Sequence, residues 1–197
     1  MSDQHIVVPT SDKKFLSSLY DWVVVIIVAL VIATVIRVFV LQQFYIAGPS
    51  METTLFQDNR VLVSKLSYRL FDIKRGDVVV FDRVTKDGGT VQHDDLIKRV
   101  IGLPGDQIEI KSCVVFINDQ PIPEPYLDDV DLSQDVLEDR CRIPTMEKQI
   151  VPPDDVFVMG DNRPQSFDSR MFGPIHESLI VGRAFVVVWP LSLFKFL

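Results

Sequence analysis

The sequence has few of the residues that build metal sites, and it has no excess of positive charge. Its 197 residues include two cysteines and three histidines, which share no metal-ligand spacing. The formal net charge is −7, which excludes the basic face that a nucleic-acid-binding domain needs. We therefore expect no metal site, no cofactor and no nucleic acid partner.

One long hydrophobic run lies near the N-terminus. Residues 22–36 read WVVVIIVALVIATVI, and a helix from Trp22 to Leu41 would be about 30 Å long, which matches the hydrocarbon core of a bilayer. Trp22 suits the headgroup level, and Arg37 can extend its guanidinium outward. A cleaved signal peptide would have a shorter apolar region followed by small residues. We predict instead an uncleaved transmembrane anchor over residues 21–41.

Basic residues beside the run predict its orientation. Lys13 and Lys14 precede it, while Arg37 favours the opposite orientation only weakly. We expect residues 1–20 to be a polar cytoplasmic tail and residues 42–197 to lie on the outer face of the cell membrane. The lipid bilayer is thus a predicted partner of a single-pass protein.

Beyond the anchor, apolar residues occur in short runs between turn signals, as is typical of β-strands at hairpin spacing. These runs are Val78–Phe81, Leu96–Ile101, Ile108–Ile110, Val114–Ile117, Val156–Met159 and Ala184–Val188. No helical stripe of comparable length occurs there. The sequence therefore predicts a mainly β protein, with one transmembrane helix followed by an antiparallel β-sheet domain.

Residues 119–155 depart from this pattern, with six prolines and an acidic run around 128–131. Such a segment is typical of a long excursion from a sheet. Cys113 and Cys141 bracket much of it. In an oxidising exterior a disulfide between them would contribute about 3 to 4 kcal/mol to stability. The alternative is two unpaired thiols, and the sequence leaves both possibilities open.

The peptide GPSM at residues 48–51 follows the hydrophobic run closely and contains a candidate nucleophile, Ser50. A serine hydroxyl is a weak nucleophile until a base takes its proton. His5, His93 and His176 are the available histidines, but none lies in a recognisable triad signature. His5 precedes the predicted anchor, and we expect the other two in surface loops.

A second candidate base lies in the predicted strand 96–101. On such a strand Lys98 shares a face with Leu96 and Val100, whereas Arg99 lies on the opposite face. Burial lowers the pKa of a lysine because it disfavours the charged form, and a neutral lysine can accept a proton, which arginine in practice cannot. Lys98 is therefore a candidate base. The alternative is a lysine that reaches solvent at a sheet edge.

Four motifs follow one another along the chain: GPSMETTL (48–55), RGDVVVF (75–81), IKRVIGLPGD (97–106) and GDNRPQSFDSR (160–170). Together they resemble the motif set of bacterial type I signal peptidases, which are membrane-anchored serine proteases. The resemblance covers the chain from the anchor onwards, except residues 111–150. It implies that family's antiparallel β-sheet catalytic domain and the removal of signal peptides from secretory precursor proteins after small residues.

The resemblance also assigns roles to residues. In the family, the serine of the first motif is the nucleophile and the lysine of the third is the general base, which implies Ser50 and Lys98 and an acyl-enzyme. The serine of the fourth motif orients the lysine amine, which implies Ser166. The aspartate and arginine that follow support the site, which implies Asp168 and Arg170. A purely structural ion pair is the alternative for these two.

By the same resemblance, a set of apolar residues lines shallow pockets for small substrate side chains. The set is Phe44, Ile46, Met51, Leu55, Leu96 and Ile97. Ordinary core packing is the alternative for each of them.

Two positions depart from the family pattern. Thr53 stands where the first motif often has proline. Gly48 stands where many members carry a hydroxyl that assists the oxyanion. Gly48 offers only its own N–H for that task, and the loss of one oxyanion donor typically costs about 10² to 10³ in rate.

Two other functions fit part of the sequence. Self-cleaving repressors of the DNA-damage response share the Ser/Lys dyad and fold class, but they are soluble and carry a DNA-binding module. An anchored β module that only binds exported proteins would not need Ser50 or Lys98, so an assay of precursor cleavage distinguishes it from an enzyme.

Overall fold

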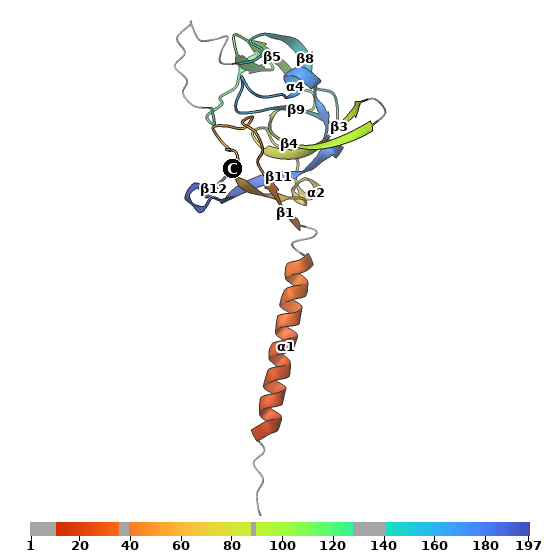
Figure 1. The fold of residues 1–197 in the computed structure, drawn as a ribbon. Coiled ribbons are helices and arrows are strands. Elements are labelled where there is room, and N and C mark those ends of the chain that lie inside the picture. The colour runs from red at the N-terminus through yellow and green to blue at the C-terminus, as the bar shows by residue number, and fades with distance from the viewer. Residues whose placement is uncertain (1–10, 36–39, 88–89, 128–140) are drawn as a thin grey trace, which may run out of the picture. The chain divides into compact units, whose positions relative to one another are not determined.

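The computed structural model describes residues 11–35, 40–87, 90–127 and 141–197. The chain divides into two compact units, Met1–Val40 and Leu41–Leu197 (Figure 1). Residues 1–10 of the predicted tail and 36–39 of the predicted anchor lie outside the described residues.

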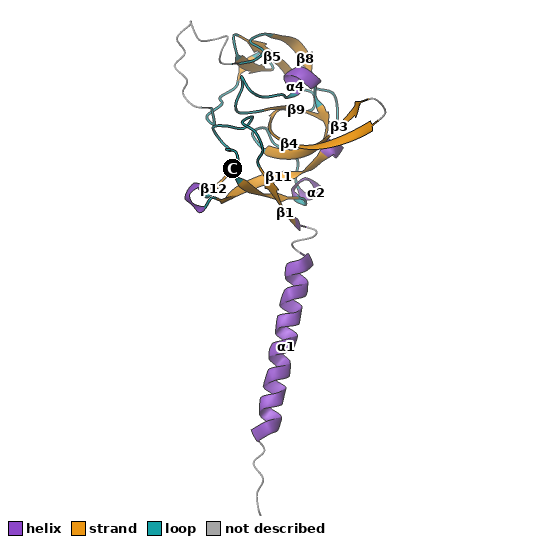
Figure 2. Ribbon diagram, in the orientation of Figure 1, coloured by secondary structure: helices purple, strands orange, loops and turns teal. Residues whose placement is uncertain are grey.

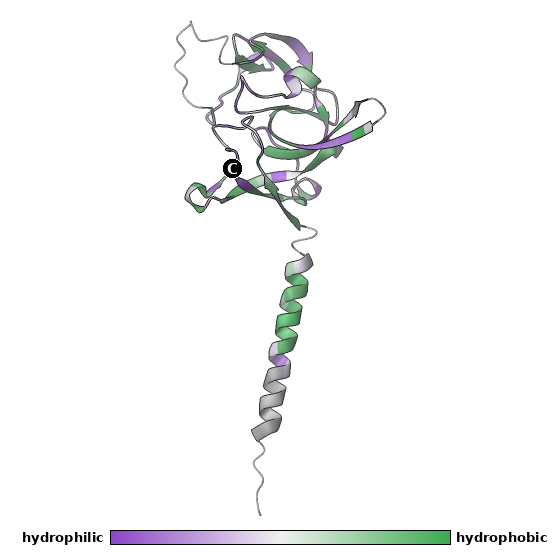
Figure 3. Ribbon diagram, viewed as in Figure 1, coloured by the Kyte–Doolittle hydropathy of each residue, from purple (hydrophilic) through white to green (hydrophobic). Residues whose placement is uncertain are grey.

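The first unit contains one helix, α1 (Ser11–Val35), which begins within the predicted polar tail. Its large apolar side chains between Trp22 and Ile32 are 40–66% exposed, and Figure 3 shows this stretch as strongly hydrophobic. In the described part of the chain, no helix combines the length and the hydropathy needed to cross a membrane. The anchor over residues 21–41 therefore stays a prediction.

The second unit is built from two antiparallel sheets (Figure 2). The larger has eight strands in the order β1-β2-β11-β3-β4-β9-β10, with β12 paired to β11. Its strands are β1 (Leu41–Tyr45), β2 (Arg60–Ser64), β3 (Val78–Asp87), β4 (Thr90–Gly102), β9 (Asp155–Met159), β10 (Ile175–His176), β11 (Ile180–Trp189) and β12 (Lys195–Phe196). The predicted mainly β, antiparallel architecture is confirmed.

The smaller sheet has four strands in the order β7-β6-β5-β8. They are β5 (Gln107–Lys111), β6 (Val114–Ile117), β7 (Gln120–Pro121) and β8 (Met146–Ile150). Among the described residues, short helical turns complete the unit: α2 (Ser67–Leu70), α4 (Ser169–Phe172), η3 (Glu177–Leu179) and η4 (Leu191–Leu193).

Strand β3 lies at the centre of the larger sheet and is buried on both faces. Val78 and Val80 pack in one apolar cluster with residues of β2 and β11, whereas Val79 and Phe81 pack in another with residues of β4 and β9. A strand covered on both sides needs apolar residues at successive positions, not at alternate ones. This requirement explains the uninterrupted run of residues 78–81.

Strand β4 begins at Thr90, six positions before the expected start at Leu96. It pairs with β3 in unbroken register from Val78↔Arg99 to Asp87↔Thr90. The expectation that His93 lies in a loop is therefore wrong, and so is the same expectation for His176, which pairs with Asp155 as the last residue of β10. Main-chain pairing in the hairpin extends the strand through exposed, polar residues, which carry no hydrophobic signal of their own.

Between β4 and β9 of the larger sheet, strands β5 to β8 form the smaller sheet, so the departure from the larger sheet begins before residue 119, and β9 returns to it at Asp155. Within the predicted excursion 119–155, β7 and β8 join the smaller sheet. Strand β8 was not predicted because its sequence, MEKQI, is mostly polar and mostly exposed. Cys113 and Cys141 are joined by a disulfide, with their Cα atoms 5.8 Å apart. Cys141 is buried, and the bond closes a loop that starts and ends beside the smaller sheet.

Removing the disulfide is expected to destabilise the second unit. A double variant, Cys113→Ser with Cys141→Ser, should lose about 3 kcal/mol of unfolding free energy, because the unfolded chain regains the entropy of the open loop. Urea unfolding without reductant measures the loss. Wild-type protein treated with reductant serves as the control. An unchanged unfolding midpoint in both would show that the bond does not constrain the fold.

Candidate active site

Ser50 lies in the loop between β1 and β2, on a turn held by buried apolar neighbours. Met51 and Leu55 are fully buried, and Ile46 is nearly so. The Leu55 N–H donates to the Met51 carbonyl at 2.7 Å, and the Glu52 N–H donates to the Pro49 carbonyl at 3.0 Å. The main chain on both sides of Ser50 is thereby fixed, while its own side chain is only half-buried.

Lys98 lies on β4 opposite Val79 of β3, and only 3% of its surface is exposed. Its Nζ atom is 2.7 Å from the Ser50 Oγ atom. The amine also donates to the Ile97 carbonyl at 2.9 Å. The second contact fixes the amine against its own strand, so that the first is held in a defined geometry. The structure thus brings together the two residues expected to form the dyad.

Burial is the main influence on the Lys98 amine, and it lowers the pKa from its ordinary value of 10.5 to about 8. The charges of Asp168 and Asp161 act in the opposite direction, because a nearby carboxylate favours the ammonium form. Near pH 8 a large part of the amine is therefore neutral. In that form it can accept the proton of the Ser50 hydroxyl.

The segment after β9 brings three further predicted residues into the same interior. Asp168 is fully buried, and Arg170 donates to both of its carboxylate oxygens at 2.8 Å. Burial acts to raise the pKa of Asp168, but the hydrogen bonds and charge of Arg170 outweigh it, and the pKa is lowered. The carboxylate also accepts from the Gly160 N–H at 3.0 Å.

Ser166 is buried beside this carboxylate, and its hydroxyl contributes to the lowered pKa of Asp168. Among the described residues, its Oγ atom has no hydrogen-bond partner of standard geometry. The Lys98 amine bonds to Ser50 and Ile97 and not to Ser166. The expected orienting role of Ser166 is therefore not visible as a direct bond and stays a prediction.

Gly160 lies very close to both the loop that carries Ser50 and the segment that carries Ser166. A Cβ atom at this position would lie 2.3 Å from both the Ser50 carbonyl oxygen and the Ser166 Oγ atom. The Asn162 N–H donates to the same Ser50 carbonyl at 3.1 Å. Only a residue without a side chain allows this approach.

An ion pair that the sequence analysis did not identify lies beside the dyad. Arg99 donates to both carboxylate oxygens of Asp161, at 2.9 and 2.6 Å, and both residues are buried. Arg99 also donates to the Thr54 hydroxyl at 3.1 Å. In the sequence, the only indication of this ion pair was an arginine within a predicted apolar strand. Its partner, 62 positions away, becomes apparent only in the folded chain.

The residues expected to line substrate pockets fall into three groups. Ile46, Met51 and Leu55 belong to the buried cluster beside β1 and β2, and Phe44 and Ile97 pack at its margin, partly exposed. Leu96 packs against the separate cluster of Val79 and Phe81. Gly48 adopts a φ of +86°, and the space that a side chain would enter there is open.

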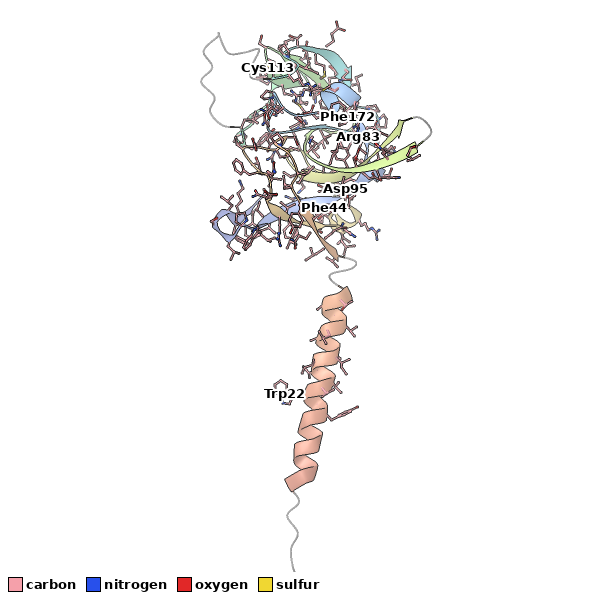
Figure 4. All side chains as sticks on the ribbon, viewed as in Figure 1. Trp22, Phe44, Arg83, Asp95, Cys113 and Phe172 are labelled. Atoms are coloured by element: carbon pink, nitrogen blue, oxygen red, sulfur yellow. A yellow bond between two sulfur atoms is a disulfide. The ribbon has the colours of Figure 1, made fainter. Side chains whose placement is uncertain are left out.

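His93 and His176 take no part in the dyad. Both are exposed, and the Nδ1 atom of His93 lies 2.7 Å from an Asp82 carboxylate oxygen. His5 lies outside the described residues. A cavity of about 310 Å³ lies elsewhere, between β3 and β10, with Arg83 and Phe172 in its lining (Figure 4). Neither dyad residue lines it.

A serine hydroxyl in contact with a buried amine of lowered pKa is the arrangement of a serine hydrolase whose base is lysine. Residues 19–189 match the family described as "Signal peptidase, peptidase S26". Signal peptidase I of Bacillus caldolyticus is 38% identical over 174 residues, covering 86% of this chain and 91% of that protein.

Two further relatives agree. A probable signal peptidase I-2 of Synechocystis is 35% identical, covering 95% of this chain and 82% of that protein. Signal peptidase IB of Staphylococcus aureus is 35% identical, covering 90% of this chain and 93% of that protein. The chain therefore belongs to the signal peptidase I family, peptidase S26. Its activity is that of a serine endopeptidase that removes signal peptides from precursor proteins, as the resemblance predicted.

Replacing Gly160 by alanine is expected to reduce precursor cleavage by at least about 100-fold, because a shift of the Ser50 main chain by about 1 Å misplaces the nucleophile. Circular dichroism should show that the β structure is retained. The double variant Gly160→Ala with Ser166→Ala removes one of the three close contacts but should not restore activity, because the contacts with the Ser50 carbonyl oxygen and the Ser166 Cβ atom remain. Near-wild-type rates in Gly160→Ala would contradict the close approach.

Replacing Lys98 by methionine is expected to stabilise the fold below pH 8. The pKa of Lys98 is lower in the folded chain than in the unfolded chain, so the cost of burying the ammonium is fully present below pH 8 and disappears as the pH rises to 10.5. The advantage of the Lys98→Met variant should shrink over that window. Urea unfolding of both proteins below and above it tests this. An advantage that is independent of pH would refute it.

Proposed function

We propose that Ser50 is the nucleophile and Lys98 the general base of signal peptide cleavage. The observation that carries the proposal is the 2.7 Å contact between the Ser50 Oγ and Lys98 Nζ atoms, inside a sheet that lowers the pKa of the amine to about 8. The hydrogen bond to the Ile97 carbonyl orients the amine, so that its lone pair can point to the serine when the group is neutral.

The reaction proceeds in two halves. Ser50 Oγ attacks the scissile carbonyl carbon while neutral Lys98 takes the hydroxyl proton, and the resulting ammonium donates that proton to the leaving amine. This yields an acyl-enzyme and releases the mature protein. Neutral Lys98 then takes a proton from water as the water oxygen attacks the ester. When the ester bond breaks, the Lys98 ammonium returns that proton to the Ser50 Oγ atom, and the signal peptide leaves with a free carboxylate.

Stabilisation of the oxyanion falls to the main chain of the nucleophile turn. The Ser50 N–H is one donor by its position on the attacking residue. Gly48 has no hydroxyl, so it can offer only its own N–H as a second donor. Asp168 and Arg170 hold the segment 160–170 in place, and we assign Ser166 to the environment of the Lys98 amine.

Substrate binding follows from the edge position of β1 in the larger sheet. An extended precursor can add its main chain to such an edge and present alternate side chains to the sheet surface. Phe44 and Ile97, partly exposed beside the buried Ile46 and Met51, form the apolar floor for the small residues before the cleavage point. Leu96 faces the other cluster and contributes less.

The location of the enzyme follows from its sequence and its disulfide. Residues 21–41 form the membrane anchor, residues 1–20 the cytoplasmic tail, and residues 42–197 the catalytic domain on the outer face. The exposed apolar side chains of α1 support the anchor. The Cys113–Cys141 bond supports an oxidising exterior for the catalytic domain. Ser50 follows closely after the anchor, at the depth where a precursor presents its cleavage site.

The dyad is tested with full-length protein in detergent and a precursor that carries a small-residue cleavage site. Wild type should cleave, with a rate that rises through an apparent pKa near 8, because only the neutral amine is a base. The Ser50→Ala and Lys98→Met variants should be inactive at every pH. Lys98→Arg is the matched control that keeps a long basic side chain but cannot lose its proton. Cleavage by Lys98→Met would rule out the dyad.

A further inference from the structure

Residues 124–126 lie beside the neighbours of the dyad in the chain, Arg99 and Thr53, and belong to a stretch that contains none of the four sequence motifs. The Tyr126 ring covers the Arg99 guanidinium, whose central carbon is 3.9 Å from the ring centroid. The Thr53 hydroxyl of the nucleophile loop donates to the Tyr126 carbonyl at 3.1 Å. Tyr126 therefore touches both the residue after the lysine base and the loop that carries Ser50.

Glu124 connects the same segment to the third part of the site. Its carboxylate accepts from both terminal nitrogens of Arg163, one of them at 3.0 Å, and from the Tyr126 hydroxyl at 2.7 Å. Arg163 in turn donates from Nε to the Gly160 carbonyl at 3.2 Å and accepts from Arg170 at its own carbonyl at 2.8 Å. A chain of hydrogen bonds thus runs from Tyr126 to the Asp168–Arg170 pair.

The Cys113–Cys141 disulfide closes the loop that contains Glu124 and Tyr126. Next to Cys141, the Arg142 N–H approaches the Arg163 carbonyl at 3.4 Å. The segment therefore contacts the site at two points on Arg163, one on Arg99 and one on Thr53.

We propose that Glu124 and Tyr126 are positioning residues for the dyad, acting through Arg163 and Arg99. The proposal rests on the Ser50–Lys98 mechanism above. The stacked ring excludes water from the Arg99–Asp161 pair, and the Glu124–Arg163 pair fixes the Gly160 carbonyl beside Ser50. Neither residue touches the reacting atoms, so both act on the geometry and electrostatics of the groups that do.

The charges around Lys98 predict how the loss of this positioning role would change the pH dependence of the activity. Two carboxylates, Asp161 and Asp168, favour the ammonium form of Lys98. Each is held by an arginine, Arg99 or Arg170. If the ring over Arg99 is lost, water reaches the Arg99–Asp161 pair beside Lys98 and weakens the desolvation that lowers the pKa of the amine. The pKa of Lys98 then rises, and the active pH range moves upward.

A role in core packing alone is the competing explanation, because Tyr126 also packs against the apolar cluster of the smaller sheet. A loss of packing lowers the amount of folded enzyme at every pH but leaves the apparent pKa of the folded fraction unchanged. The pH profile therefore separates the two explanations.

The test compares kcat and KM across pH for full-length wild type and Tyr126→Leu, which keeps apolar bulk but removes the aromatic face. We expect the rising limb of kcat to shift upward by about half a pH unit or more, with kcat near pH 7.5 reduced about three- to tenfold and KM within about twofold. Tyr126→Phe should restore the wild-type limb, because the ring remains. Phe116→Leu, which removes the ring near Lys111 in the same small sheet, should leave the limb unchanged.

The outcomes are separable. The positioning role is overturned if the rising limb of the kcat–pH profile of Tyr126→Leu superimposes on that of wild type. In that case activity would fall only in proportion to the amount of unfolded protein. If Tyr126→Leu does not fold, Glu124→Gln tests the other half of the proposal, because it weakens the pair that fixes the Gly160 carbonyl through Arg163. We expect kcat to fall with KM within about twofold, and an unchanged kcat per folded enzyme there overturns the proposal. Cleavage by Lys98→Met would instead show that the dyad itself is wrong, whatever Tyr126 does.

Discussion

The site depends on the exclusion of water from one amine. In the proposed mechanism, Lys98 can act as a base near neutral pH only because it is buried, and that burial makes any unpaired charge nearby costly. Asp161 and Asp168 each favour the ammonium form of the amine, and Arg99 and Arg170 each bind one of them through two hydrogen bonds. The two buried ion pairs are thus a consequence of the choice of lysine, since an unpaired buried charge would be costly in its own right.

Three segments that are distant in the sequence meet at this amine: the nucleophile turn, the middle of β4 and the loop after β9. The larger sheet brings the last two together because β4 and β9 are neighbours. The turn that carries Ser50 is fixed differently, by burial of Met51 and Leu55 and by its close approach to Gly160. Hydrophobic packing thus sets the position of the nucleophile, and main-chain pairing sets that of the base.

The sequence predicted those parts of the fold that have a local signal. The run of residues 78–81 predicted a strand, and the structure shows that it is buried on both faces. The polar residues of β8 and of the outer half of β4 gave no hydrophobic pattern and were missed or placed in a loop. Spacing alone left Lys98 ambiguous, and the family motifs selected it. The partners of Arg99 could not be predicted, because Asp161 and Tyr126 approach it only through tertiary folding. The predicted anchor and the finer roles of Ser166 and Gly48 stay predictions.

The neighbours Lys98 and Arg99 point to opposite faces of β4, and the pairing of β3 with β4 determines which of them faces the nucleophile. Because side chains alternate along a strand, a slip of one residue would exchange the two faces. The guanidinium, which retains its proton, would then take the place of the amine, and the chain could form a compact sheet without any base. The contact between Ser50 and Lys98 therefore forms only in the correct strand register. A deletion of one residue within this hairpin would be far more damaging than most substitutions there.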